Sequence, residues 1–240
     1  MTALLHRLTR IPSTMDLLHT LAAQGAEAGT AVVAEEQTGG RGSRGRSWHS
    51  PRGGLWLSLL YRPAWTVGAE VAGIRVGLAV AEALAEMAGA DTFRLKWPND
   101  LMAGPRKLGG ILCEARWQGE VPTWVAVGIG LNVENPVPDS LSGVATNLAE
   151  YIPGTTVDSL LPGLLGRLRA VELAAGQLSP DELSRFAVRD WLRGRALRQP
   201  AAGVADGIAE DGALLVRTAD GRIESVRAGT VELADPPIRA

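Results

Sequence analysis

The sequence contains a single cysteine, three histidines and two lysines. Cys113 has no second cysteine to pair with, so an internal disulfide is excluded, and this composition fits a reducing compartment. His6, His19 and His49 have no metal-ligand spacing among themselves or with Cys113. We therefore expect no zinc site and assign Cys113 to the core.

Long apolar stretches are also absent. No apolar run reaches about 18 residues, and the first residues lack the apolar segment of a signal peptide. We expect a cytoplasmic protein that does not associate with a membrane. A net charge of −2 excludes a globally basic nucleic-acid binder. The 240 residues, 46% of them apolar, are enough for one sizeable core and a small second domain.

Lysine is nearly absent, although basic residues are not. Of the 24 basic residues only Lys96 and Lys107 are lysines. Arginine can replace lysine wherever a planar guanidinium serves equally well, so the two lysines are candidates for sites that need a compact ammonium group. The alternative is that both remained by chance.

An arginine- and glycine-rich stretch follows a predicted strand. The apolar run Ala31 to Ala34 predicts a buried strand, and residues 39–48 then read Gly-Gly-Arg-Gly-Ser-Arg-Gly-Arg-Ser-Trp. The glycines permit turns with positive φ and exposed N–H groups, and we expect Arg41, Arg44 and Arg46 to converge on one small volume. This stretch predicts an anion-holding loop at the end of a sheet.

Two known glycine-rich motifs do not fit this stretch. The pattern Gly40-x-Gly42-x-x-Gly45 formally matches the dinucleotide fingerprint, but that fingerprint requires a helix after its glycines. Here Leu55 to Tyr61 predicts another strand. A kinase glycine-rich loop also lies between strands, yet the chain has no His-Arg-Asp or Asp-Phe-Gly signature.

Further strands carry polar residues and glycines. Residues 93–101 read as a strand ended by proline, after which Asn99 and Asp100 favour a turn that directs both side chains at one point. An ordinary turn is the alternative. Residues 106–114 and 123–133 predict paired strands whose glycines indicate the close approach of a ligand or of another backbone.

Helical patterns separate these strands, and the C-terminal part changes character. Ser13 or Thr14 is expected to cap a first helix, and capping alone is the alternative to a role in binding. We predict further helices over Gly68 to Gly89, Gly154 to Ala175 and Pro180 to Trp191. Short β-like runs with Asp-Gly turns then follow, over residues 205–209, 213–218, 223–227 and 230–233. We place a boundary near Leu192, between domains 1–191 and 192–240.

Four motifs occur in the order and spacing found in biotin protein ligases, and the chain resembles this family from Ser13 to its C-terminus. They are the arginine loop followed by Trp48, Lys96-Trp97-Pro98-Asn99-Asp100, Lys107-Leu108-Gly109-Gly110-Ile111 and Gly128-Ile129-Gly130-Leu131-Asn132-Val133. The resemblance implies an α+β fold, with a mixed β-sheet flanked by helices as in the class II synthetase-like biotin/lipoate ligase domain. It also implies a C-terminal SH3-like β-barrel.

The resemblance implies a two-step reaction. ATP and biotin form biotinyl-5′-AMP with Mg²⁺, and a lysine of a biotin carboxyl carrier protein then displaces AMP. Bifunctional members carry an N-terminal DNA-binding domain, for which this chain leaves no room, so we expect no binding to DNA. A homodimer is also possible by resemblance.

Matching positions suggest roles for individual residues. Lys107, Arg41 and Lys96 match catalytic positions. Biotin contacts are implied for Ser13, Thr14, Met15, Gln37, Arg41, Gly42, Ser43, Lys107, Gly109 and Gly110. Nucleotide contacts are implied for Arg44, Arg46, Trp48, Asn99 and Asn132, with Asp100 as a Mg²⁺ ligand. Trp48 is expected to stack on adenine, and a core anchor that closes the loop is the alternative.

Two positions depart from the family pattern. Ser43 stands where arginine is usual, which predicts faster escape of the adenylate. Met15 replaces a commonly polar residue near the ureido head of biotin. Lipoate ligases and octanoyltransferases share the fold, but their Arg-x-x-Gly-Gly-Gly type loop is absent. A nucleotide-binding module without catalysis is the non-enzymatic alternative.

Overall fold

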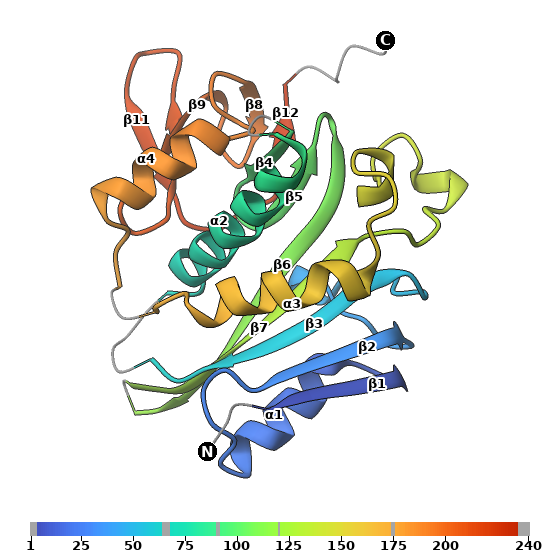
Figure 1. Ribbon diagram of the computed structural model, residues 1–240. Coiled ribbons are helices and arrows are strands. Elements are labelled where there is room, and N and C mark those ends of the chain that lie inside the picture. The colour runs from blue at the N-terminus through green and yellow to red at the C-terminus, as the bar shows by residue number, and fades with distance from the viewer. Residues whose placement is uncertain (1–3, 64–67, 90–91, 120, 174–175, 235–240) are drawn as a thin grey trace.

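The computed structural model describes residues 4–63, 68–89, 92–119, 121–173 and 176–234. Seven strands form a mixed sheet in the order β1-β2-β3-β7-β6-β5-β4 (Figure 1). β1 and β2 are parallel, and the other neighbours are antiparallel. The strands are β1 (Leu5–Ile11), β2 (Ala31–Gln37), β3 (Gly54–Tyr61), β4 (Phe93–Lys96), β5 (Asp100–Ala103), β6 (Arg106–Gln118) and β7 (Val121–Asn132). The expected mixed sheet with flanking helices is confirmed.

Helices cover the two faces of this sheet unequally. α1 (Thr14–Ala23) packs on β2, β3 and β7, where Leu18 joins a small apolar cluster. α2 (Ala69–Ala88) and α3 (Val157–Arg169) cover the other face and share the main core with the sheet (Figure 1). The strand β3 is buried along its whole length because it lies between these layers.

The observed helix limits refine the expected ones. α2 lies within the predicted span. α3 begins after Thr156, which forms a capping box with Ser159, and it ends at Arg169. It is therefore shorter than predicted at both ends, and residues 174–175 of the predicted span lie outside the described residues. α4 (Pro180–Arg189) stops before Trp191 because Asp190 is extended and pairs with Leu95 of β4.

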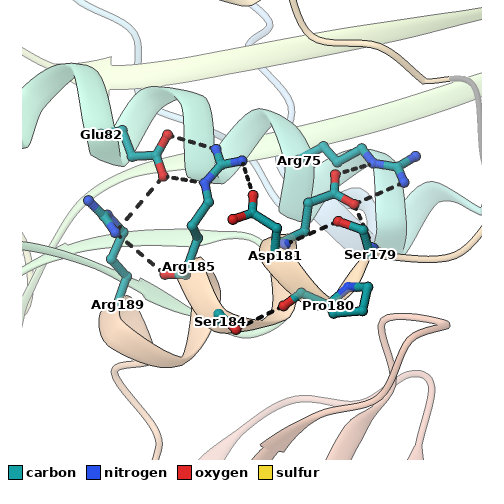
Figure 2. A network of polar contacts seen from close by, with 9 residues as sticks. Arg75, Glu82, Ser179, Pro180, Asp181, Ser184, Arg185 and Arg189 are labelled. Carbon is teal, nitrogen blue, oxygen red and sulfur yellow. Dashed lines mark hydrogen bonds and ion pairs between the residues drawn. The ribbon is translucent and has the colours of Figure 1, made fainter.

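Ion pairs hold α4 against α2 (Figure 2). Arg75, whose side chain is 7% exposed, donates its Nε to Glu182 Oε1 at 2.6 Å. Arg185 binds both carboxylate oxygens of Glu82, at 2.8 Å each. Arg75 also donates to the carbonyl of Gln177 at 2.7 Å, which ties it to the chain just before α4. These ion pairs therefore fix how α4 lies against α2.

The C-terminal part forms a second, antiparallel sheet in the order β11-β10-β9-β8-β12. Its strands are β8 (Ala196–Gln199), β9 (Gly203–Ile208), β10 (Leu214–Arg217), β11 (Ile223–Val226) and β12 (Glu232–Leu233). Four of them match the predicted runs and β8 is additional. The antiparallel C-terminal sheet is consistent with the expected SH3-like domain, and over the described residues it is open, with β11 and β12 as its edges.

A second apolar cluster joins the two sheets. Trp97 and Trp191 pack there with Leu192 and Leu214. The indole N–H of Trp97 donates to the carbonyl of Gly212 at 2.8 Å.

Within the described residues no helix is long and apolar enough to cross a membrane.

Candidate active site

Two cavities meet at one end of the seven-stranded sheet. The first has a volume of about 170 Å³ and lies between α1, the arginine loop and strands β3, β6 and β7. The second has a volume of about 470 Å³ and extends toward residues 135–145 and Leu233 of the C-terminal sheet. Ser47, Trp48 and Lys107 line both cavities. The side chains of Trp48 and Lys107 therefore stand at the junction, with Lys107 Nζ 5.0 Å from the ring centroid of Trp48.

A chain of polar side chains lines the first cavity. The Thr14 hydroxyl donates to Gln37 Oε1 at 3.0 Å and lies 2.7 Å from the Ser58 hydroxyl. Because Thr14 gives its only proton to Gln37, Ser58 donates to Thr14. The amide of Gln37 in turn donates to the Ser50 hydroxyl at 3.0 Å. Ser13 occupies the N-cap position of α1 without a side-chain cap bond, so its hydroxyl is not used for capping.

Glycines on β7 make room for side chains of the cavity. A Cβ on Gly128 would lie 3.1 Å from Met15 Sδ, and a Cβ on Gly130 would lie 2.7 Å from Trp48 Nε1. Both side chains thus pack directly on the β7 backbone. Met15 is buried and lines the first cavity. Its replacement of a polar residue is explained by this packing, since a flexible thioether fills the space above a glycine.

The two glycines on β6 differ in what they face. Gly110 lines the first cavity, and a Cβ there would make only ordinary contacts with Lys107. Gly109 does not line either cavity, and a Cβ there would lie 2.6 Å from the carbonyl oxygen of Gly130 on β7. Packing of neighbouring strands, rather than a ligand, thus requires the glycine at position 109.

The two lysines lie near each other at this site. Lys107 Nζ is 2.5 Å from Asp100 Oδ1, across the β5–β6 pairing. Lys96 lines the second cavity, and burial lowers the pKa of its ammonium, opposed by the charge of Asp100 and reinforced by that of Lys107. Asn99 ties β6 in place because its side-chain amide donates to the carbonyl of Ile111 at 2.7 Å.

Arg41 and Arg46 both line the first cavity but Arg44 does not, so the expectation that all three loop arginines converge was wrong. Arg41 pairs with Asp16 at 2.7 Å, and Arg44 donates to the hydroxyl of Thr230 in the C-terminal part. Arg46 bonds to the carbonyl and hydroxyl oxygens of Ser43, at 3.3 and 3.1 Å. Like charges in one short loop repel, and each guanidinium has an oxygen partner in a different direction.

Backbone geometry accounts for the glycines of this loop. Arg44 and Gly45 both have positive φ, 61° and 71°. A Cβ on Gly40 would lie 2.6 Å from the carbonyl oxygen of Trp48, and the Gly40 carbonyl accepts the Trp48 N–H at 2.9 Å. The loop closes on itself through this contact and presents Trp48 to the cavity junction.

Arg41 belongs to a larger polar cluster behind the loop. Its guanidinium also lies 3.7 Å from Glu114, whose other oxygen lies 2.8 Å from His19 Nε2. The indole of Trp124 donates to His19 Nδ1 at 3.0 Å, so the ring proton of His19 is on Nε2 and points to Glu114. The hydrogen bond from His19 lowers the pKa of Glu114, and Arg41 lowers it further against the effect of burial.

The structure places most of the predicted site residues around the two cavities. Those lining the first cavity are Ser13, Thr14, Met15, Gln37, Arg41, Gly42, Ser43, Arg46, Trp48, Asn99, Lys107 and Gly110. Those lining the second are Lys96, Trp48, Asp100, Lys107 and Asn132. Arg44 and Gly109 line neither. The side chain of Asn132 makes its hydrogen bonds within the protein. Its amide N–H donates to the Thr146 carbonyl, and its amide oxygen accepts from the side chain of Asn135.

Sequence reasoning missed Ser58 and Glu114. Ser58 is the one polar side chain between Leu55 and Leu60 of a fully buried strand, and that isolation was a usable signal. Glu114 ends the expected strand 106–114 and had no such signal, because its partners come from α1 and the arginine loop.

The donor set bears on a metal ion. Within the described ranges no three His, Cys, Asp or Glu side chains gather as a metal site. Asp100 is a single carboxylate at the second cavity. Mg²⁺ binds through one or two carboxylates together with substrate phosphates, so this set fits an ion that arrives with a nucleotide rather than a resident one.

One buried donor at the cavity junction has no partner in the described part of the chain. The indole Nε1 of Trp48 is buried and makes no hydrogen bond. Buried donors are normally satisfied, and this one lies against the Gly130 backbone, where a Cβ would be 2.7 Å away. The Trp48 side chain nevertheless lines both cavities, the second of which is also lined by Lys96 and Lys107, and this arrangement suits two substrates that meet there.

Comparison with known proteins identifies the family. Residues 8–132 match the model of the biotin/lipoate A/B protein ligase family, and residues 193–234 match that of the biotin protein ligase C-terminal domain. The chain belongs to the biotin protein ligase family. The bifunctional ligase/repressor BirA of Bacillus subtilis is 32% identical over 93% of this chain and 72% of its own length. The biotin--[acetyl-CoA-carboxylase] ligase of Paracoccus denitrificans is 32% identical over 80% of this chain and 85% of its own.

Solved structures of biotin protein ligases have the same fold. The Aquifex aeolicus enzyme in complex with biotin and ATP superposes with a TM-score of 0.79 at 28% identity, covering 97% of this chain and 99% of that one. The Leishmania major enzyme in complex with biotinyl-5-AMP has a TM-score of 0.64 at 27% identity, covering 95% of this chain and all of that one. The Paracoccus denitrificans relative and both solved structures are named as biotin ligases, which favours biotin over lipoate.

Proposed function

We propose that this ligase uses ATP to join biotin to a lysine of a biotin carboxyl carrier protein. The observation that carries the proposal is the meeting of two cavities at Lys107 and Trp48. The first cavity suits biotin, since apolar walls end in the Ser58–Thr14–Gln37 hydrogen-bond chain, which offers groups to a ureido head. The second suits a nucleotide, because Lys96 and Lys107 line it.

In the first step a carboxylate oxygen of biotin attacks the α-phosphorus of ATP. The new O–P bond gives biotinyl-5′-AMP, and the bond to pyrophosphate breaks. Two anions must approach each other, so fixed cations at the junction are the effective catalysts, each worth about 2–4 kcal/mol. We assign this work to Lys107 at the reacting groups and to Lys96 on the nucleotide side. Arg41 joins them in the proposal once it exchanges Asp16 for a substrate anion.

In the second step the acceptor amine attacks the mixed anhydride. The nitrogen forms an amide bond with the carbonyl carbon of biotin, AMP leaves, and the amine loses a proton. The anhydride must be kept from water, and the arginine loop over the first cavity suits this task. Asp100 would hold Mg²⁺ brought by ATP, and the ion would neutralise phosphate charge. The homodimer remains a prediction, which a measurement of the molecular mass in solution would test.

Pyrophosphate exchange into ATP tests this function. The purified protein should catalyse exchange that depends on biotin and not on lipoate or octanoate. Lys107→Ala should abolish biotin-dependent exchange while thermal unfolding changes little, because the Lys107 side chain is part-exposed and its ammonium meets Asp100 and the face of Trp48 rather than the core. Lipoate-dependent exchange would favour the alternative ligase, and full activity of Lys107→Ala would remove this residue from the reaction.

A further inference from the structure

Lys96 sits at the second cavity without a partner of opposite charge. Across the described residues no carboxylate forms an ion pair with its ammonium, and Asp100, its neighbour across the β4–β5 hairpin, is held by Lys107 at 2.5 Å. Burial lowers the pKa of Lys96, and the nearby charges of Lys107, Arg195 and Arg46 act in the same direction, against that of Asp100. A long, flexible side chain in this setting needs another device to hold it toward the cavity.

The face of an indole supplies that device. Lys96 Nζ lies 5.5 Å from the ring centroid of Trp191, within the range of a cation–π contact. Both residues line the second cavity. Trp191 is 8% exposed, so the contact is largely shielded from water.

Several contacts fix the ring of Trp191. Its indole N–H donates to the Gly104 carbonyl at 2.8 Å, and its backbone N–H donates to the Leu95 carbonyl at 2.8 Å. The guanidinium of Arg195 lies 3.9 Å from the ring centroid and donates to the Trp191 carbonyl at 2.7 Å. The ring is therefore held at both ends, and it cannot follow a mobile lysine.

The path of the chain explains why this ring meets Lys96. After α4 ends, Asp190 pairs in parallel with Leu95, the residue before Lys96. The Asp190 carboxylate accepts the N–H of Leu192 at 2.8 Å, an Asx turn that bends the chain directly after this pairing. The connection between the two sheets thus runs along β4 and sets Trp191 beside the lysine.

We propose that Trp191 is a positioning residue that holds the Lys96 ammonium against the nucleotide side of the active site through the face of its indole. The inference rests on the proposed function, in which Lys96 bears on the nucleotide. The segment that joins the two sheets then contributes to adenylate formation and is not only a linker.

Two substitutions separate the ring face from simple packing. Trp191→Phe keeps an aromatic face, whereas Trp191→Leu keeps apolar bulk without one, and both lose the bond to Gly104. Kinetics of biotin-dependent pyrophosphate exchange are measured for each. We expect Trp191→Leu to lower kcat/KM for ATP about 3- to 30-fold below Trp191→Phe, with the KM for biotin equal in the two. Trp117→Leu, at a half-exposed position near the end of β6, is the control for loss of a tryptophan.

A background without the lysine completes the test. When Lys96→Met is combined with either substitution, calorimetric titration of ATP should show the same affinity for Trp191→Phe as for Trp191→Leu. Equal exchange kinetics of the two variants when Lys96 is present, or a parallel rise in the KM for biotin, would overturn the inference. Absence of biotin-dependent exchange in the unaltered protein is a different result, which overturns the proposed function itself.

Discussion

Gly130→Ala should separate the nucleotide side of the site from the stability of the fold. An added Cβ would lie 2.7 Å from Trp48 Nε1 and 2.9 Å from Cε2. Carbon contacts are favourable at about 3.5–4.0 Å, so the indole must move by roughly 1 Å. Trp48 can move because its indole N–H has no hydrogen bond to break within the described residues.

The expected loss follows from this displacement. A misplacement of about 1 Å in a site costs about 100-fold in rate, and overpacking costs about 1–3 kcal/mol where the neighbour cannot give way. We expect kcat/KM for ATP in biotin-dependent pyrophosphate exchange to fall by about 100-fold. The midpoint of thermal unfolding should change little, because the added methyl group displaces Trp48 in the loop and leaves the strands of the sheet in place.

Gly128→Ala is the matched control on the same strand. Its Cβ would lie 3.1 Å from Met15 Sδ, a flexible side chain that can adjust. This variant should alter the KM for biotin modestly and leave the KM for ATP unchanged. If Gly130→Ala retained activity for ATP within about twofold of the unaltered protein, the argument that Trp48 packs on β7 would be refuted.

Three further changes probe other parts of the site. Ser43→Arg should slow the release of biotinyl-5′-AMP, measured by rapid filtration, because a guanidinium is added to a loop that lines the first cavity; equal or faster release would contradict the role of Ser43. Met15→Ala should enlarge the first cavity and raise activity with ring-enlarged biotin analogues relative to biotin, and an equal loss for both would show that Met15 acts only in the core. The hydrogen bond from His19 depresses the pKa of Glu114 below its ordinary value of 4.5, so this carboxylate stabilises the fold above that value and loses its contribution as the pH falls through its folded pKa. Glu114→Gln should therefore lower the unfolding midpoint at pH 7 by more than at pH 3, and a difference independent of pH would disprove this linkage.

Strands and helices followed well from local pattern. β3 is a continuous apolar run with one serine, and α2 lies between two glycines and is mostly apolar and small residues with a few charged ones among them. In both, burial acts on residues that are close in the sequence. The end of α4 did not follow, because Asp190 leaves the helix to pair with Leu95.

Site residues were predictable where they stand in motifs. Lys107 was singled out by the scarcity of lysine and lies at the junction of the two cavities. The arginine loop was also recognised, but the directions of its side chains were not. Arg41 turns to Asp16 and Arg44 to Thr230, and these partners lie 25 residues before and 186 residues after in the chain.

The sequence by itself determined the family, most of the strands and helices along the chain, and the four motifs, because each depends on residues that are near neighbours in the chain. Only the tertiary structure decided which glycine serves which purpose. Gly109 accommodates the backbone of β7, Gly128 accommodates Met15, and Gly130 accommodates Trp48. The physical reason is that a missing Cβ matters only through the atoms that pack against it. Those atoms come from other strands, from α1 and from the arginine loop, and the pairing register of the sheet brings them there.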